Sequence, residues 1–174
     1  ENYSVSRNTA REALRSLAAL GAVEIRLGVK GGATIASGDA EAIGETLAIQ
    51  HRLSGVPEDE VLEVQSVLEG LAAERAAEHA TPEDIKLLED LLEEAETLIN
   101  NPPAFSNSSL AFHMAIAEAA HSQALMMQLL SIRYFIWPPN NTVPNPKVAE
   151  NVIRSHHRLL ELIKNQDAAG AHEF

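Results

Sequence analysis

The start of the chain shows a helical pattern of apolar residues followed by a strand-like one. The apolar residues that recur at the spacing of one helix face are Ala10, Leu14, Leu17 and Ala18. The pattern predicts a helix over residues 7–20, with Ser6 as its N-cap and Gly21 closing it. Residues 22–26 and 33–36 then alternate as two short strands around a glycine-rich turn, so a helix followed by a β-hairpin is expected.

From residue 40 onward the apolar pattern is helical and is interrupted by breaks rich in proline and asparagine. The predicted helices cover residues 40–53, 57–79, 81–100, 104–120, 123–137 and 146–165. The clearest start signal is Thr81 followed by Pro82, an N-cap residue and then proline at the first helical position. By pattern alone, the second part of the chain is a bundle of about six helices.

Charge is distributed unevenly along the chain. The chain carries a net charge of −12, which by itself argues against binding to nucleic acid. Residues 1–38, however, hold five Lys or Arg and three Glu, a net of +2, whereas the remainder holds eight basic and 22 acidic residues, a net of −14. Only the N-terminal segment is therefore suited to an acidic partner, and the rest would repel it.

The composition excludes several classes of protein. The 174 residues include no cysteine, which rules out disulfides, thiolate metal sites and a cysteine nucleophile. The sequence contains no run of about 18 apolar residues, so no transmembrane helix is expected. There is neither a signal peptide nor an initiating Met, and we expect the chain, which opens at Glu1, to be cut within a motif. A cytoplasmic protein without a membrane partner is the expectation.

The predicted N-terminal helix carries the chemistry of DNA recognition near its start. Arginine pairs with guanine through two hydrogen bonds, and Ser, Thr or Asn can hold phosphates or base edges. Arg7, Asn8, Thr9 and Arg11 suit these roles, and Lys30 lies at the hairpin tip, where it would reach a phosphate. From the residues alone, a solvated amphipathic helix explains the same pattern equally well.

Residues 1–36 resemble the winged helix-turn-helix of the GntR family of transcriptional regulators. The resemblance rests on the strings SVSRNTAREALRSL (residues 4–17) and GAVEIRLG (residues 21–28). It implies that the main DNA contacts are Arg7 and Arg11, with Ser6 and Thr9 beside them and Gly28 in the wing. The first helix of the family motif and most of the second have no counterpart in this sequence.

Residues 58–174 resemble the FCD effector domain of the FadR-type subfamily of GntR regulators. The matching strings include TPED (residues 81–84), LAFHMAIA (residues 110–117) and the stretch from His156 to Asp167. The resemblance implies three parts: a DNA-binding domain over residues 1–36, a linker and linking helix over residues 37–57, and an effector domain over residues 58–174 whose C-terminal helix is incomplete. The expected fold is mainly α, a truncated winged helix-turn-helix with a small β-hairpin, followed by an antiparallel all-helical bundle.

Two histidines on apolar stripes are the candidate ligands of a site in the bundle. His113 and His156 each sit on an apolar helix face, where an imidazole either binds a metal or is a hydrogen-bonded core residue. The family resemblance implies a divalent metal (Zn, Ni or Mn) held by an Asp, the first His at 113, the second at 156 and a third beyond Phe174. Position 109 is Ser instead of Asp, and Gln65 stands where many members carry an Arg.

The sequence therefore predicts an effector pocket around Gln65, Ser109, His113 and His156, with either a weakened metal site or a metal-free pocket. The favoured function is a homodimeric regulator that binds a double-stranded DNA operator and responds to a small-molecule effector, with an organic acid as one candidate. It is not expected to be an enzyme. The alternatives are a metal-binding helical-bundle enzyme, a metal-free regulator that senses an acyl ligand, and a purely structural interaction module.

Overall fold

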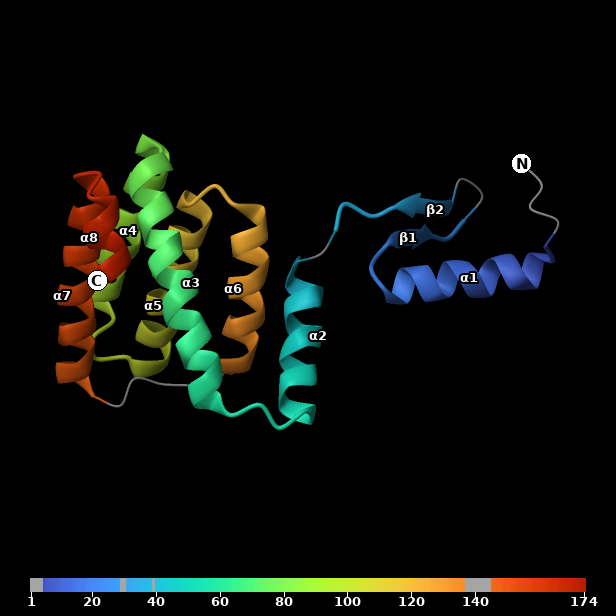
Figure 1. The fold of residues 1–174 in the computed structure, drawn as a ribbon, viewed down its shortest axis with the longest axis horizontal. Helices are drawn as coiled ribbons and strands as arrows, with labels where there is room; N and C mark the ends of the chain where they lie inside the picture. Colours follow the sequence, from blue (N-terminus) through green and yellow to red (C-terminus); the bar gives the residue numbers. More distant parts are fainter. Residues whose placement is uncertain (1–4, 29–30, 39, 137–144) are drawn as a thin grey trace. The chain divides into compact units, whose positions relative to one another are not determined.

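The chain is mainly helical and carries one two-stranded antiparallel hairpin, as the sequence predicts (Figure 1). A computed structural model describes residues 5–28, 31–38, 40–136 and 145–174. The chain divides into two compact units, Glu1–Ile43 and Gly44–Phe174. The domain limits expected at residues 36 and 58 stay predictions, because a compact unit is not by itself a domain boundary.

The N-terminal unit consists of helix α1 (Arg7–Ala19) and strands β1 (Val23–Arg26) and β2 (Gly32–Ile35). The Ser6 side chain caps α1 by accepting a hydrogen bond of 3.1 Å from the Thr9 backbone N–H. Gly21, with a φ of +69°, takes the left-handed conformation that ends the helix. Both predicted ends of this helix are therefore confirmed.

The hairpin turn depends on glycine. Gly28 has a φ of +116°, which side chains rarely tolerate, and its carbonyl accepts a hydrogen bond of 2.9 Å from the Gly31 N–H. A Cβ atom at Gly31 would collide with the Arg26 carbonyl oxygen. Lys30, the predicted wing contact, lies outside the described residues.

Among the residues that the structure describes, the second unit holds most of α2 and all of six further helices. Their bounds are α2 (Ala40–Leu53), α3 (Glu58–His79), α4 (Pro82–Thr97), α5 (Pro102–Ala119), α6 (Gln123–Ile136), α7 (Pro146–Lys164) and α8 (Ala168–Glu173). In Figure 1, α3 crosses the bundle, and it contacts α5, α6, α7 and α8. Among the described residues, every helix is too short or too polar to span a bilayer.

Small side chains on α3 allow its neighbours to come close. Ala72, Ala73, Ala76 and Ala77 are all buried, in a core that also contains side chains from α4, α5, α6, α7 and α8. At Gly70 the approach is closer still, since a Cβ there would lie 2.9 Å from the backbone oxygen of His172 on α8. The alanine and glycine positions thus fix how near α8 lies to α3.

The predicted start of α4 is also confirmed. The Thr81 hydroxyl accepts from the Asp84 N–H, and the Asp84 carboxylate accepts from the Thr81 N–H at 2.8 Å, which completes a capping box. His121 lies 2.9 Å from the same carboxylate. Partial burial alone would raise the pKa of Asp84, but the hydrogen bonds from Thr81 and His121 outweigh it and lower that pKa.

Helix α2 is attached to α6 through its last turn. The Arg52 guanidinium donates hydrogen bonds of 2.9 Å to the carbonyls of Tyr134 and Phe135, at the C-terminal end of α6. The same guanidinium lies over the Phe135 ring, 5.4 Å from its centroid. Arg52 therefore satisfies backbone carbonyls at the end of α6 that have no partner within the helix.

Candidate functional site

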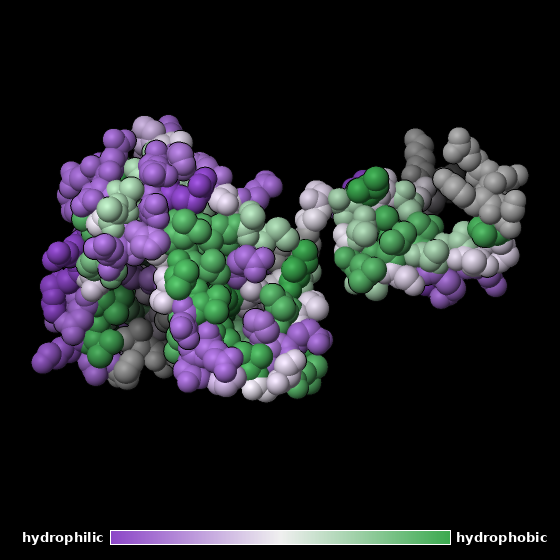
Figure 2. All heavy atoms as spheres, in the orientation of Figure 1, coloured by the Kyte–Doolittle hydropathy of each residue, from purple (hydrophilic) through white to green (hydrophobic). Residues whose placement is uncertain are grey.

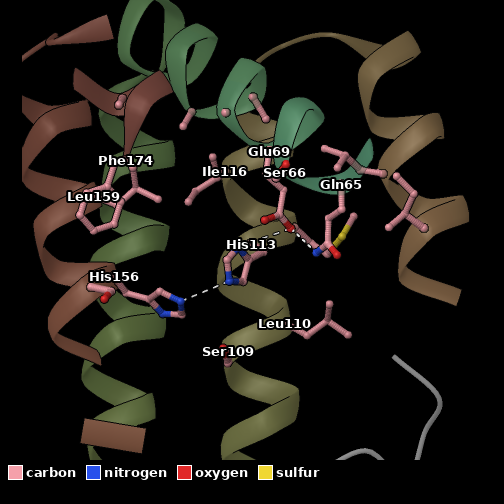
Figure 3. A pocket seen from close by; sticks show the side chains of 18 of the residues that line it. Gln65, Ser66, Glu69, Ser109, Leu110, His113, Ile116, His156, Leu159 and Phe174 are labelled. Carbon is pink, nitrogen blue, oxygen red and sulfur yellow. Dashed lines mark hydrogen bonds and ion pairs between the residues drawn. The ribbon is translucent and has the colours of Figure 1, made fainter. Parts of the chain in front are cut away.

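A cavity of about 450 Å³ lies inside the bundle, lined by residues of α3, α5, α6, α7 and α8 (Figure 3). All four residues predicted for the effector pocket line it: Gln65, Ser109, His113 and His156. Gln65 comes from α3, Ser109 and His113 from α5, and His156 from α7. The fold thus brings together residues that are up to 91 positions apart in the sequence, between 65 and 156.

The two histidines contact one another in the lining of the cavity. The Nε2 atoms of His113 and His156 are 3.3 Å apart, and the rings meet edge to face (Figure 3). His156 is buried and its ring stacks on Phe112 with centroids 4.4 Å apart. Burial, assisted by the nearby imidazoles of His113 and His157, lowers the pKa of His156 to about 3. His156 is therefore a neutral imidazole at neutral pH.

Two polar residues of α3, Gln65 and Glu69, continue the row of polar contacts that begins at the two histidines; we term this row the polar wall. The Gln65 Nε2 donates a hydrogen bond of 2.7 Å to Glu69 Oε1, and the same oxygen lies 3.7 Å from the His113 Nδ1 (Figure 3). A carboxylate only accepts hydrogen bonds, so the amide nitrogen of Gln65 must face Glu69. The other end of that amide, Oε1, is buried without a hydrogen-bond partner in the protein.

Three further residues with ionisable side chains line the cavity and were not predicted from the sequence. Glu69 has a usable signal, because it lies four residues after Gln65 and so shares its helix face. Arg133 is a cation within an otherwise apolar stretch of α6 and also lines the cavity. His172 lines it as well, and its Nδ1 lies 2.7 Å from Glu74 Oε2.

The donor atoms fit part of a metal site. For metal–nitrogen bonds of about 2.0–2.1 Å, tetrahedral geometry places two ligand nitrogens about 3.3 Å apart, and the histidine Nε2 atoms have a separation of 3.3 Å. Ser109 is buried one turn before His113 and brings no charge to a cation. Within the described part of the chain, no three His, Cys, Asp or Glu side chains are grouped to hold a metal. The set is incomplete, so no step is assigned to a metal.

The predicted DNA-contacting residues have two different roles in α1. The hydroxyls of Ser6 and Thr9 lie 2.8 Å apart and belong to the helix cap. Arg7 and Arg11 are exposed and lie one turn apart on the helix. Arg15, one turn further along, forms a 2.8 Å ion pair with Glu12. The cap therefore holds the helix start that presents Arg7 and Arg11 to solvent.

The helical unit that holds the cavity falls within a known domain family. Residues 60–174 match the FCD domain family. The chain belongs to this family, and its predicted resemblance to FCD-containing GntR regulators is confirmed.

Named relatives agree with this assignment. The chain is 30% identical over 125 residues to the HTH-type transcriptional regulator LutR of Bacillus subtilis, a match that covers 72% of this chain and 56% of LutR. It is 29% identical over 180 residues to the putative L-lactate dehydrogenase operon regulatory protein of Escherichia coli, covering 96% of this chain and 67% of that protein. The chain thus spans little more than half the length of LutR.

The solved structure of a GntR protein from Streptococcus agalactiae has the same fold. Its TM-score is 0.66 at 22% sequence identity, and the match covers 99% of this chain and 78% of that one. At this identity the likeness supports the fold alone.

The low pKa of His156 predicts a loss of stability in acid. In the unfolded chain His156 takes up a proton near its ordinary pKa of 6.5, whereas in the folded chain it does so only near about 3. Between these values the unfolded state binds more protons, so the free energy of unfolding falls as the pH falls, by about 2 kcal/mol from this residue between pH 7 and 5.

The His156→Gln variant should lose less stability than the unmodified chain between pH 7 and pH 5, in urea unfolding followed by circular dichroism with a chelator present. The matched control is His157→Gln, because His157 is half exposed and pairs with Glu96 at 2.8 Å. An equal loss in the His156 variant and the unmodified chain would contradict the argument.

Proposed function

We propose that the chain is part of a ligand-responsive transcriptional regulator that acts in the cytoplasm. The observation that carries the proposal is the cavity lined by His113 and His156, which lies within the segment that matches the FCD family. The relatives are named as transcriptional regulators, which favours a regulator over the enzyme alternative. A small-molecule effector would bind in the cavity and change the affinity of the N-terminal unit for an operator.

Support for DNA binding comes from the charge and exposure of α1. The basic N-terminal segment, with its net of +2, presents Arg7 and Arg11 on one exposed helix face. The N-terminal residues of a recognition helix read base edges in the major groove, and cations nearby hold phosphates. Ser6 and Thr9 would contribute through the cap and through contacts to the backbone of the DNA.

Replacing Arg7 or Arg11 with Ala should weaken operator binding by about 1–3 kcal/mol if the arginine reads a base. If it holds a phosphate instead, the log–log salt slope should become shallower by about one unit. Fluorescence anisotropy with duplex DNA at several salt concentrations measures both quantities. Arg15→Ala is the control on the same helix, since Arg15 already pairs with Glu12. DNA binding that is unchanged in both variants would contradict the assignment.

We further propose that His113 and His156 form the polar end of the effector site. This pair would hold a divalent metal only if further donor groups coordinate the same ion. The Nε2 spacing of 3.3 Å supports two metal ligands, whereas Ser109 and Gln65 supply no charge. A metal-free pocket, as in a regulator that senses an acyl ligand, is the second candidate because of these two residues.

Elemental analysis of the purified protein separates the two candidates. Near-stoichiometric zinc, nickel or manganese that is lost in both His113→Ala and His156→Ala would establish a metal site. His121→Ala is the control, because His121 lies outside the cavity lining and pairs with Asp84. Absence of metal from the unmodified protein after incubation with each ion would leave the metal-free pocket.

We also propose a homodimer, joined through an exposed apolar ridge on α3. Val64, Val67 and Leu71 form this ridge at i, i+3 and i+7, and Val67 is 64% exposed. Figure 2 shows apolar side chains gathered near α3 on this face, with polar ones around them. A two-fold symmetric regulator suits an operator with two half-sites.

Val67→Asp should shift the mass measured by sedimentation from two chains to one, because a charge in an apolar interface loses its hydration. Leu62→Asp is the control: Leu62 is 46% exposed and lies on the opposite side of α3, roughly 180° around the helix from Leu71. A monomeric unmodified chain, or a dimer that tolerates Val67→Asp, would exclude this ridge as the interface.

A further inference from the structure

The apolar ridge on α3 has a residue of opposite charge at each end. Glu60 lies one turn before Val64, and Arg75 lies one turn after Leu71. At 100° per residue, these four positions fall within an arc of about 60° and extend over roughly 22 Å of helix. Along one face, α3 therefore presents an acidic residue, an apolar ridge and then a basic residue.

Neither of these charges is paired within the part of the chain that the structure describes. Arg75 is half-buried, and its Nε is buried without a hydrogen-bond partner. No carboxylate of the described residues forms an ion pair with it. Glu60 is exposed in the first turn of α3 and is also unpaired among these residues. A guanidinium that is partly removed from water would be stabilised by a carboxylate from another molecule.

The spacing of these residues is self-complementary. The midpoint between positions 60 and 75 lies between residues 67 and 68, and so does the midpoint between positions 64 and 71. In a two-fold interface, each contact between two different residues occurs twice, once in each direction. Two antiparallel copies of α3 centred on this point would therefore place Glu60 beside the partner's Arg75, and Val64 beside the partner's Leu71.

Other arrangements of two α3 helices lack this match. A parallel two-fold pair would bring each charged residue against its own copy, so that like charges would meet. An antiparallel pair centred on position 69 would pair Arg75 with Glu63, but it would also bring Glu60 opposite Glu78. Of these three arrangements, the antiparallel register centred between residues 67 and 68 is the one that gives both unpaired charges an opposite charge.

We propose that a second copy of this chain binds the ridge in this antiparallel register, which is selected by reciprocal ion pairs between Glu60 and the partner's Arg75. Val64, Val67 and Leu71 lose contact with water in this interface, which supplies affinity. The ion pairs lie at its two ends and fix the orientation of the chains. This inference rests on the proposed function, since it specifies how the proposed homodimer is joined.

Charge reversal tests the register, with the dimer dissociation constant of the full chain measured by sedimentation equilibrium. Glu60→Arg or Arg75→Glu alone should raise that constant by at least about 10-fold, because two-fold symmetry repeats each like-charge contact. The double variant Glu60→Arg/Arg75→Glu should return the constant to within about 3-fold of its value in the unmodified chain. An equimolar mixture of the two single variants should form a heterodimer that is tighter than either homodimer.

The matched control is Glu58→Arg. Glu58 shares the first turn of α3 with Glu60, so its reversal loses a similar interaction with the helix dipole. It lies about 160° from Glu60 around the helix, and its reversal should leave the dissociation constant unchanged. Rescue of Arg75→Glu by Glu63→Arg instead of by Glu60→Arg would overturn the register.

Circular dichroism of each variant checks that it is folded. A dimer that tolerates both single reversals, or that the double variant fails to restore, would overturn this register and leave the ridge and the regulator proposals standing. A monomeric unmodified chain would overturn the homodimer and the register together. The regulator proposal fails separately, if Arg7→Ala and Arg11→Ala leave DNA binding unchanged.

Discussion

The close packing of α3 against its neighbours is the constraint on which the effector unit depends. Four buried alanines and Gly70 let the helices around α3 approach its backbone. Larger side chains there would have to be accommodated by movement of backbone, because the atom nearest to a Cβ at Gly70 is a carbonyl oxygen of α8. The same approach brings α8 to the cavity, where Ala171 and His172 complete one wall.

Local signals in the sequence predict the elements and the two histidines well. Ser6, Gly21 and the Thr81–Asp84 capping box act through groups at most three residues away, so a single sequence contains all the information they need. His113 and His156 were predictable for a related reason: each lies on an apolar stripe that must face the core. The 3.3 Å contact between their Nε2 atoms depends on tertiary structure, because it is set by how α5 packs against α7.

The parts of the site that escaped prediction depend on packing between helices. Arg133 gave only the signal of a charge in an apolar stretch, and its place in the lining of the cavity follows from the packing of α6 against α5. Glu69 was within reach by its spacing from Gln65, but its approach to His113 needs the α3–α5 contact. Periodicity assigns residues to a helix face, whereas it does not say which two faces meet.

The polar wall also explains how a buried, uncharged imidazole is tolerated in the core. The Glu69 carboxylate on the Nδ1 side of His113 favours the tautomer with its proton on Nδ1. The Nε2 of His113 is then an acceptor, and the Nε2–H of His156 can donate to it across 3.3 Å. A charged His156 would keep this donor, but it would be removed from water and would lie close to the other imidazoles, so burial and its neighbours together lower its pKa. Through its charge near His113, a residue of α3 thus favours one hydrogen bond for a residue of α7.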